Sequence, residues 1–346
     1  MEKAYGEGIL TIALGTAPTQ ALTGEWVSNP AAAAARSPAV VSVCVPFFKF
    51  DVVPLVEKLL ALASVRSEQL ELLLLDDASC DEQLTREVRQ RIDEAPVPAK
   101  LLTLRRNEGR ARVRNYLVDA AQGSYLLFLD CDMYPDSDEF IARYLTYAAA
   151  AEYDIVVGGC SYARLGPVKA SELLYFYHSN RTQCVPVAAR RRAPVRYFFT
   201  NNMMAKRSLF ARLTFDPGYE GWGYEDTDLA MGATRAGARI AHIENTATHL
   251  GLIDDDAVIR KYRNSVANFM RLIGKYPREA GSFPVYRAAR LVARMPLPFE
   301  RLSDRVENLA RARFLPVVFR YASLQCMKLL MYSGALRQNG QYAAER

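Results

Sequence analysis

A run of apolar residues that ends in two aspartates constrains the fold of this chain more than any other stretch. The run covers residues 125–135, Y-L-L-F-L-D-C-D-M-Y-P, and it follows Gly123. A short, continuous apolar run bounded by turn residues is typical of a fully buried strand. Asp130 and Asp132 come at its carboxyl end, and they share one face because side chains alternate along a strand. In open α/β sheets this end of the strand is where ligands bind.

Strand-like and helical patterns alternate before this run. The strand-like stretches are residues 40–45, 70–77 and 100–104, and helical spacing covers residues 53–65, 81–92 and 109–121. Regular alternation predicts a mainly parallel, doubly wound α/β sheet. A second acidic strand end, Asp76 and Asp77, then lies at the same edge as Asp130 and Asp132, because parallel strands point the same way.

Acidic side chains at this edge indicate a divalent cation. Hard oxygen ligands suit Mg²⁺ or Mn²⁺, and such an ion would bind a phosphate or diphosphate. Asp76 or Asp77 would accept hydrogen bonds from a base or a ribose. The alternative for Asp77 is turn and cap chemistry before a helix at Asp81, and the alternative for a lone Asp-x-Asp pair is two solvated loop acids.

A second informative block is the glycine-rich stretch 215–228, F-D-P-G-Y-E-G-W-G-Y-E-D-T-D. It predicts a loop with Trp222 as an aromatic wall, followed by a helix whose first turn carries Glu225, Asp226 and Asp228. The helix dipole explains one of these acids but not a tryptophan between two glycines. A carboxylate beside an aromatic wall and other acids has a raised pKa, which suits a general base.

His249 follows about 20 residues later, in A-T-H-L-G. A lone histidine is more often structural than a ligand. Here carboxylates are already predicted at the sheet edge, so His249 is a candidate metal ligand.

Length, composition and cysteine usage exclude several protein classes. The chain has 346 residues, half of them hydrophobic, which is enough for a sizeable core. Its six cysteines form no Cys-x-x-Cys pair, which favours reduced thiols in the cytosol over a zinc site or a disulfide framework. Residues 1–36 lack a signal-peptide pattern, so no export is expected. We expect a flexible arm over residues 1–38, with the alanine run 31–35 as a linker.

The basic residues of the chain gather at its C-terminal end. Residues 260–346 contain 17 basic and 5 acidic residues, whereas the first 259 contain 27 and 33. The same segment carries an apolar stripe at helical spacing, interrupted by Arg320 and Lys328: Phe314, Val317, Val318, Tyr321, Leu324, Met327, Leu330 and Met331. The stripe is either a surface-lying contact with an anionic membrane or a helical cap packed on the core.

A basic run between the two acidic blocks has two interpretations. Arg190, Arg191, Arg192 and Arg196 form either a solvated, mobile loop or a lid that closes over a diphosphate. Asn201 and Asn202 follow, and we expect them near an acceptor.

Taken in order, five motifs resemble a known family. The chain resembles GT-A fold, family 2 nucleotide-sugar glycosyltransferases in these motifs: V-S-V-C-V-P-F-F, L-L-L-L-D-D-A-S-C-D, R-R-N-E-G-R-A-R-V-R-N, Y-L-L-F-L-D-C-D-M-Y-P-D and the block from Gly218. The last block is similar to the Gly-Trp-Gly-x-Glu-Asp signature of β-1,4-galactosyltransferase-like and chondroitin-polymerase-like catalytic domains. The resemblance covers residues 39–275.

The resemblance implies a fold and a division of the chain. The fold is a GT-A (Rossmann-like), mainly parallel mixed sheet flanked by helices, with a helical C-terminal extension. The expected parts are the arm 1–38, the catalytic domain 39–275 and the basic helical extension 276–346.

The resemblance also implies an inverting transfer from a nucleoside-diphosphate sugar, expected to be UDP-linked. Asp226 would deprotonate the acceptor hydroxyl, and Mn²⁺ or Mg²⁺ would neutralise the leaving diphosphate. The implied metal ligands are Asp132, His249 and Asp130. The implied donor-binding residues are Pro46, Phe47, Asp76, Asp77, Arg114 and Asp130, and the implied acceptor-binding residues are Trp222, Gly223 and Glu225.

The chain departs from the family pattern at two places. Phe48 and Lys49 stand where the family often has Asn-Glu, which puts the first loop of the donor site in question. Arg112 and Val113 replace the usual small residues before Arg114 and Asn115.

Two other functions are compatible with these residues: a metal-dependent nucleotidyltransferase, and a degenerate nucleotide-binding module with a basic tail for a membrane or a nucleic acid. The joint presence of Asp132, Asp226 and His249 argues against degeneration. We expect a nucleotide-sugar donor, a saccharide, lipid-linked or peptide acceptor, and no nucleic acid. The expected location is the cytoplasm, with the segment 276–346 as the candidate for a peripheral contact at the inner face of the membrane.

Overall fold

The computed structural model describes residues 24–35 and 37–340, which form two compact units. Unit 1 comprises the chain up to Arg164 together with Val185–Pro217 and Leu229–Leu250. Unit 2 comprises Leu165–Cys184, Gly218–Asp228 and the chain from Gly251. The unit boundaries therefore differ from the expected division at residue 275.

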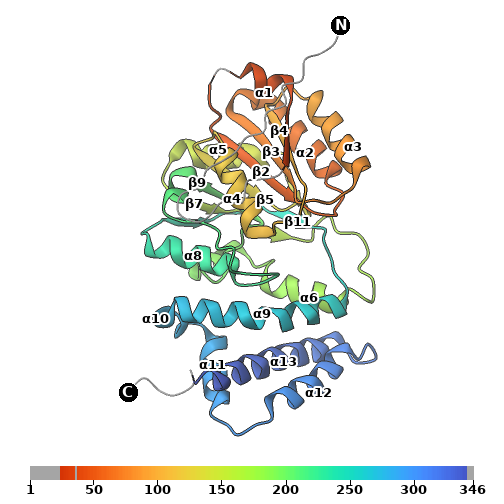
Figure 1. Cartoon of the computed structure of the whole chain (residues 1–346), viewed down its shortest axis with the longest axis vertical. Coiled ribbons are helices and arrows are strands. Elements are labelled where there is room, and N and C mark those ends of the chain that lie inside the picture. Colours follow the sequence, from red (N-terminus) through yellow and green to blue (C-terminus); the bar gives the residue numbers. More distant parts are fainter. Residues whose placement is uncertain (1–23, 36, 341–346) are drawn as a thin grey trace. The chain divides into compact units, whose positions relative to one another are not determined.

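Unit 1 is built on an eight-stranded mixed sheet flanked by helices (Figure 1). The strand order is β1 (Gly24–Ser28), β4 (Ala99–Leu104), β3 (Leu70–Asp76), β2 (Val41–Phe47), β5 (Tyr125–Leu129), β9 (Asn202–Lys206), β7 (Ile155–Val157) and β10 (Ile240–His242). Strands β4, β3, β2 and β5 are parallel, whereas β9 is antiparallel to both of its neighbours. The predicted fold class is confirmed, and the central strand predicted at residues 125–129 is β5, which is buried along its whole length.

A small second sheet in unit 1 follows β5. It consists of β6 (Met133–Pro135), β11 (Ala247–His249) and β8 (Cys160–Ser161), with β11 in the middle. Strand β6 begins one residue after Asp132, so this sheet continues the chain directly beyond the two aspartates. The helices and 3-10 turns of unit 1 are α1 (Pro30–Ala34), α2 (Val53–Ala63), η1 (Ser64–Gln69), α3 (Glu82–Asp93), α4 (Arg110–Ala120), α5 (Phe140–Ala150), α7 (Val187–Arg192) and η2 (Arg207–Ala211).

Part of the expected flexible arm is structured. Strand β1 pairs with the edge strand β4, and the half-buried Trp26 packs on the core. Asn29 is fully buried: its side chain caps α1 by accepting a hydrogen bond from Ala32, and it donates to the carbonyl oxygens of Ile92 and Val97. The alanine-rich composition is typical of a linker, but these contacts are made to residues about 70 positions away. Residues 1–23 lie outside the described part of the chain.

The basic run lies in and just after α7, and its arginines differ in burial: Arg191, Arg192 and Arg196 are exposed, whereas Arg190 is buried. Arg190 is 2% exposed, and its guanidinium donates hydrogen bonds to the carbonyl oxygens of Val185, Val157 and Ile243. Charge alone suggests that an arginine is exposed. A guanidinium has five N–H donors, however, and can be buried where carbonyl oxygens at strand ends accept them. Asn202 is also fully buried, where it donates to carbonyl oxygens of unit 1, so it is not available to an acceptor.

Unit 2 is helical, which confirms the predicted helical C-terminal region. It contains α6 (Leu173–Thr182), α9 (Asp255–Lys275), α10 (Pro277–Ala280), α11 (Pro284–Ala293), α12 (Phe299–Arg311) and α13 (Val317–Gln338). Helix α9 joins this unit because its apolar face, with Val258 and Ile259, packs with Leu324 and Met327 of α13. None of the described helices combines the length and the apolar content needed to cross a bilayer.

The predicted apolar stripe divides into two parts. Leu324, Met327 and Leu330 of α13 are buried in the core of unit 2. Phe314 and Val318 are 87% and 54% exposed. The stripe therefore both packs on unit 2 and leaves apolar side chains at its surface.

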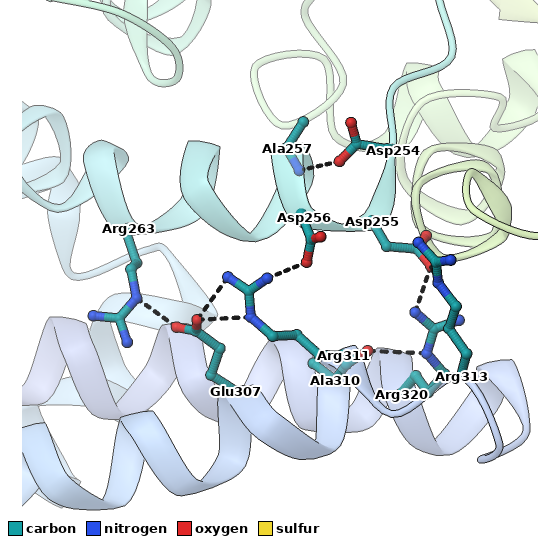
Figure 2. A network of polar contacts seen from close by, with 10 residues as sticks. All are labelled: Asp254, Asp255, Asp256, Ala257, Arg263, Glu307, Ala310, Arg311, Arg313 and Arg320. Atoms are coloured by element: carbon teal, nitrogen blue, oxygen red, sulfur yellow. Dashed lines mark hydrogen bonds and ion pairs between the residues drawn. The ribbon is translucent and has the colours of Figure 1, made fainter.

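A buried ion pair joins α9 and α13 in unit 2 (Figure 2). Arg320 of α13 donates to Asp255 of α9 at 2.5 Å, and both side chains are almost fully buried. The other carboxylate oxygen of Asp255 accepts a hydrogen bond from the backbone of Leu174 in α6. The neighbouring Asp254 is exposed and caps α9, by accepting from the amide of Ala257.

We expect Asp255→Asn to lower the free energy of unfolding by about 3–5 kcal/mol, because it leaves the Arg320 charge buried without its carboxylate. Asp254→Ala, the matched control one residue earlier, is expected to cost about 1 kcal/mol through loss of a cap. Chemical denaturation of both variants measures the difference. Equal losses for the two variants would contradict the assignment.

Candidate functional site

Asp132 and His249 meet beside the carboxyl end of β5. His249 Nε2 lies 3.1 Å from Asp132 Oδ2, although the two residues are 117 positions apart. Antiparallel pairing of β11 with β6 places His249 opposite Met133, and the amide of Leu250 donates to the carbonyl oxygen of Asp132. The small sheet therefore brings two of the three predicted metal ligands together, Asp132 and His249.

The charge on Asp132 is stabilised by its neighbour. Burial raises the pKa of Asp132, but the hydrogen bond and charge of His249 outweigh this, so the pKa lies below its ordinary value. On its other side, His249 Nδ1 lies 3.4 Å from the hydroxyl of Tyr162. Such contacts orient a histidine ring for ligation.

Asp130 is held by a buried arginine. Arg114 of α4 is 3% exposed and donates to Asp130 Oδ1 at 2.7 Å. The guanidinium also lies over the ring of Phe215. The structure thus brings Arg114 and Asp130 together, with the Arg114 side chain almost fully buried.

The donor set fits a hard divalent cation with few protein ligands. No group of three or more histidine, cysteine, aspartate or glutamate side chains in residues 24–35 and 37–340 has a geometry suited to a metal ion. Mg²⁺ and similar ions, however, are commonly bound by one or two carboxylates together with substrate phosphates and water. Asp132 supplies one such carboxylate and His249 adds an imidazole nitrogen, whereas an Oδ of Asp130 is already hydrogen-bonded to Arg114.

The two acids at the end of β3 have different environments. Asp77 accepts hydrogen bonds from the amides of Glu108 and Gly109, at 2.6 and 3.0 Å, and from the side chain of Asn107. Both of its oxygens therefore hold the loop before α4. Asp76 is 1% exposed and accepts from the amide of Ser79. Burial raises the pKa of both carboxyl groups, and these hydrogen bonds oppose the rise.

The end of β2 presents little side chain to a ligand. Phe47 is 2% exposed, so its ring belongs to the core, and its carbonyl oxygen accepts from the amide of Asp77. Pro46 is half-buried in the same strand. Phe48 is 43% exposed, and the left-handed Lys49 bonds through its amide to Ser79.

Residues of α9 contact the glycine-rich loop of unit 2. Trp222 packs edge-to-face on Tyr262, with ring centres 5.3 Å apart. The buried Asn268 donates to the carbonyl oxygens of Glu220 and Trp222. Gly223 has a φ of 104°, which a side chain rarely adopts, and a Cβ there would meet Ser265 at 3.3 Å.

Tyr224, directly before the predicted acids, is a residue that sequence reasoning did not single out. Its φ of 74° is unusual for an aromatic residue, and such strain costs about 1–3 kcal/mol and gathers at functional sites. Its hydroxyl donates to the hydroxyl of Tyr332 in α13 at 2.7 Å, and Tyr332 lies 3.1 Å from Ser265. A tyrosine between a glycine and an acid gives no local signal of this contact, which spans 108 positions.

The three acids after Tyr224 differ in burial. Asp228 is 4% exposed, and it pairs with Lys275 at 2.7 Å and accepts from Tyr219. It is therefore a structural residue. Glu225 and Asp226 are half-buried in the first turn of α8 (Glu225–Arg235).

The predicted residues thus form two groups. Unit 1 contains the residues predicted for the donor and the metal: Pro46, Phe47, Asp76, Asp77, Arg114, Asp130, Asp132 and His249. Those for acceptor and base, Trp222, Gly223, Glu225 and Asp226, belong to unit 2. The chain passes from one unit to the other within α8, after Asp228.

Comparison with solved structures gives many matches, two of which we describe. A mannosyltransferase from Pyrobaculum calidifontis, PcManGT, in complex with GDP-Man and Mn²⁺, is 17% identical with a TM-score of 0.54, and the match covers 88% of each chain. TarS 1-349 from S. aureus in complex with UDP-GlcNAc is 16% identical with a TM-score of 0.47, over 88% of this chain and 93% of that one. No curated protein matches the sequence. The first structure shows that the fold is shared with a GT-A glycosyltransferase.

The family model described as glycosyl transferase family 2 matches residues 42–214. The match is half of the chain and includes β2, β3, β5 and both aspartates at the end of β5; it ends before the glycine-rich loop. With the shared fold and the strand order around β5, it shows that this chain belongs to glycosyl transferase family 2.

Proposed function

We propose that this protein is a metal-dependent inverting glycosyltransferase that uses a nucleoside-diphosphate sugar. The observation that carries the proposal is the approach of Asp132 and His249 to 3.1 Å beside the Arg114–Asp130 pair. The similar fold of PcManGT, crystallised with GDP-Man and Mn²⁺, supports a nucleotide-sugar donor and a divalent cation.

The residues of unit 1 hold the donor in this proposal. Asp132 and His249 are the ligands for Mn²⁺ or Mg²⁺, which when bound would neutralise charge on the departing diphosphate. Asp130, oriented by Arg114, faces the ribose or the ion. Asp76 is the better candidate for the nucleoside than Asp77, because both oxygens of Asp77 already bind the loop before α4.

The residues of unit 2 hold the acceptor and move the proton. Trp222 and Gly223 form an apolar platform for the acceptor. Glu225 accepts hydrogen bonds from hydroxyl groups of the acceptor. Asp226 removes the proton of the acceptor hydroxyl. The new oxygen bond forms at the anomeric carbon as the bond to the diphosphate breaks, so the configuration inverts in one displacement.

A panel of nucleotide sugars, each assayed with Mn²⁺, with Mg²⁺ and with a chelator, tests this function. We expect release of a nucleoside diphosphate from at least one donor, dependent on the cation. Release of inorganic pyrophosphate from a nucleoside triphosphate and a sugar phosphate would identify a nucleotidyltransferase instead.

Tyr224 positions the acids that follow it, since its hydroxyl bonds to Tyr332 of α13. We expect Tyr224→Phe to lower kcat about 2- to 10-fold, the worth of one net hydrogen bond, with an unchanged Kd for the donor. Tyr286→Phe, on a half-buried tyrosine of α11, is the matched control. An equal loss of donor affinity would mean that Tyr224 supports the fold in general rather than the acids.

A further inference from the structure

The exposed large apolar side chains of the described residues concentrate in one short stretch. Seven of the twelve fall within residues 291–319, and we call them the exposed apolar set: Leu291, Met295, Leu297, Leu309, Phe314, Val318 and Phe319. Soluble surfaces usually scatter such residues singly, and a concentration of them marks an interaction site.

Most of this set lies in or beside two loops at the ends of α12 (Figure 1). The loop before α12 reads R-M-P-L-P, residues 294–298, and the loop after it contains R-F-L-P, residues 313–316. Each presents an exposed arginine directly before an exposed apolar residue, and each contains proline. A 13-residue helix separates them by about 20 Å, so two similar contact points flank one helix.

The charge around the exposed apolar set is positive. Five arginines of residues 287–319 are exposed: Arg287, Arg294, Arg301, Arg305 and Arg313. The exposed acids of the same stretch are Glu300 and Asp304, and Asp304 is paired with Arg263 of α9 at 2.5 Å. The surface therefore combines protruding apolar side chains with an excess of guanidinium groups.

We propose that this surface of unit 2 binds the face of an anionic lipid membrane. Phe314, Met295 and Leu297 would enter the interface between headgroups and acyl chains, while the arginines bind lipid phosphates. The buried half of the stripe keeps α13 packed in unit 2, so binding requires no unfolding. The inference goes beyond the proposed glycosyl transfer and does not depend on it.

Charge favours a membrane over a second copy of the chain. A two-fold interface places the same patch of both copies face to face, so a surface with an excess of arginines would face the same excess of positive charge. An anionic leaflet offers the opposite charge. The apolar side chains also protrude from loops, with Phe314 at 87% exposure, which suits insertion into a soft surface.

Sedimentation of the full chain with vesicles tests the proposal without any sugar donor. We expect binding to vesicles of phosphatidylglycerol and phosphatidylcholine, weakened at least tenfold on pure phosphatidylcholine and weakened by high salt. Phe314→Ser combined with Phe319→Ser, and separately Arg294→Glu combined with Arg301→Glu, should each reduce binding at least tenfold. Because these side chains are exposed, thermal unfolding should be near that of the wild type.

Val65→Ser is the matched control, since Val65 is 82% exposed in η1 of unit 1. It should bind vesicles as the wild type does. The proposal is overturned if the wild type does not bind anionic vesicles, if the control loses binding equally, or if the phenylalanine variant retains it. A dimer in light scattering that Phe314→Ser and Phe319→Ser abolish would assign the surface to a second copy instead.

Discussion

Asp226→Asn is expected to lower the rate of sugar transfer by roughly 10² or more, while the Kd for the donor is unchanged. Asparagine keeps the size of the side chain and much of its hydrogen bonding, but it cannot accept a proton from the acceptor hydroxyl. A loss in kcat without a loss in donor affinity identifies an interaction made in the transition state. Single-turnover transfer and calorimetric donor titration measure the two quantities.

The control for this variant is Glu220→Gln, an exposed acid of the same loop that keeps its backbone contact with Asn268. It should retain nearly full activity. Transfer by Asp226→Asn at close to the normal rate would move the base to Glu225. Asp228 is excluded as a substitute because Lys275 and Tyr219 already occupy its buried carboxylate.

Asp132→Ala is expected to abolish transfer, with a loss of at least about 10² in rate, together with the enhancement of nucleoside-diphosphate binding by Mn²⁺. The carboxylate is one of the two ligands proposed for the cation, so its removal leaves only the His249 imidazole of that pair. Titration of UDP and GDP with and without Mn²⁺ provides a readout that does not depend on turnover.

Asp138→Asn is the control for this second variant, because its carboxylate is 83% exposed and pairs only with Lys58 among the contacts described for it. It should behave as the wild type does. Full activity of the wild type in the presence of a chelator would reject the metal assignment, whatever the effect of Asp132→Ala on the fold.

The first and second predictions separate the two groups of site residues. Asp226→Asn should leave the Mn²⁺-dependent nucleotide affinity intact, because the metal ligands belong to unit 1. Asp132→Ala should remove that affinity while thermal unfolding of the protein stays near that of the wild type. A variant that loses both properties would indicate a general effect on folding.

The strands of the central sheet and the family could both be predicted from local patterns in the sequence. Strands β2, β3 and β5 are mostly apolar, and such runs can be recognised without knowledge of the rest of the chain because a strand buried on both faces is rich in apolar residues. Their alternation with helical spacing then predicts parallel order, and the motifs at their ends indicate the family that the family model shows.

Contacts between residues far apart in the sequence could not be predicted and are seen only in the tertiary structure. The pairing of His249 with Asp132 depends on the register of β11 on β6, and the hydrogen bond from Tyr224 to Tyr332 depends on the packing of α13. Charge and composition did not predict that the side chains of Arg190 and Asn29 are buried. Each is buried with carbonyl oxygens as hydrogen-bond acceptors, and these come from residues far away in the sequence. Local periodicity carries no information on such contacts, so Leu324 and Phe314 read alike in the sequence, yet one is in the core of unit 2 and the other is at its surface.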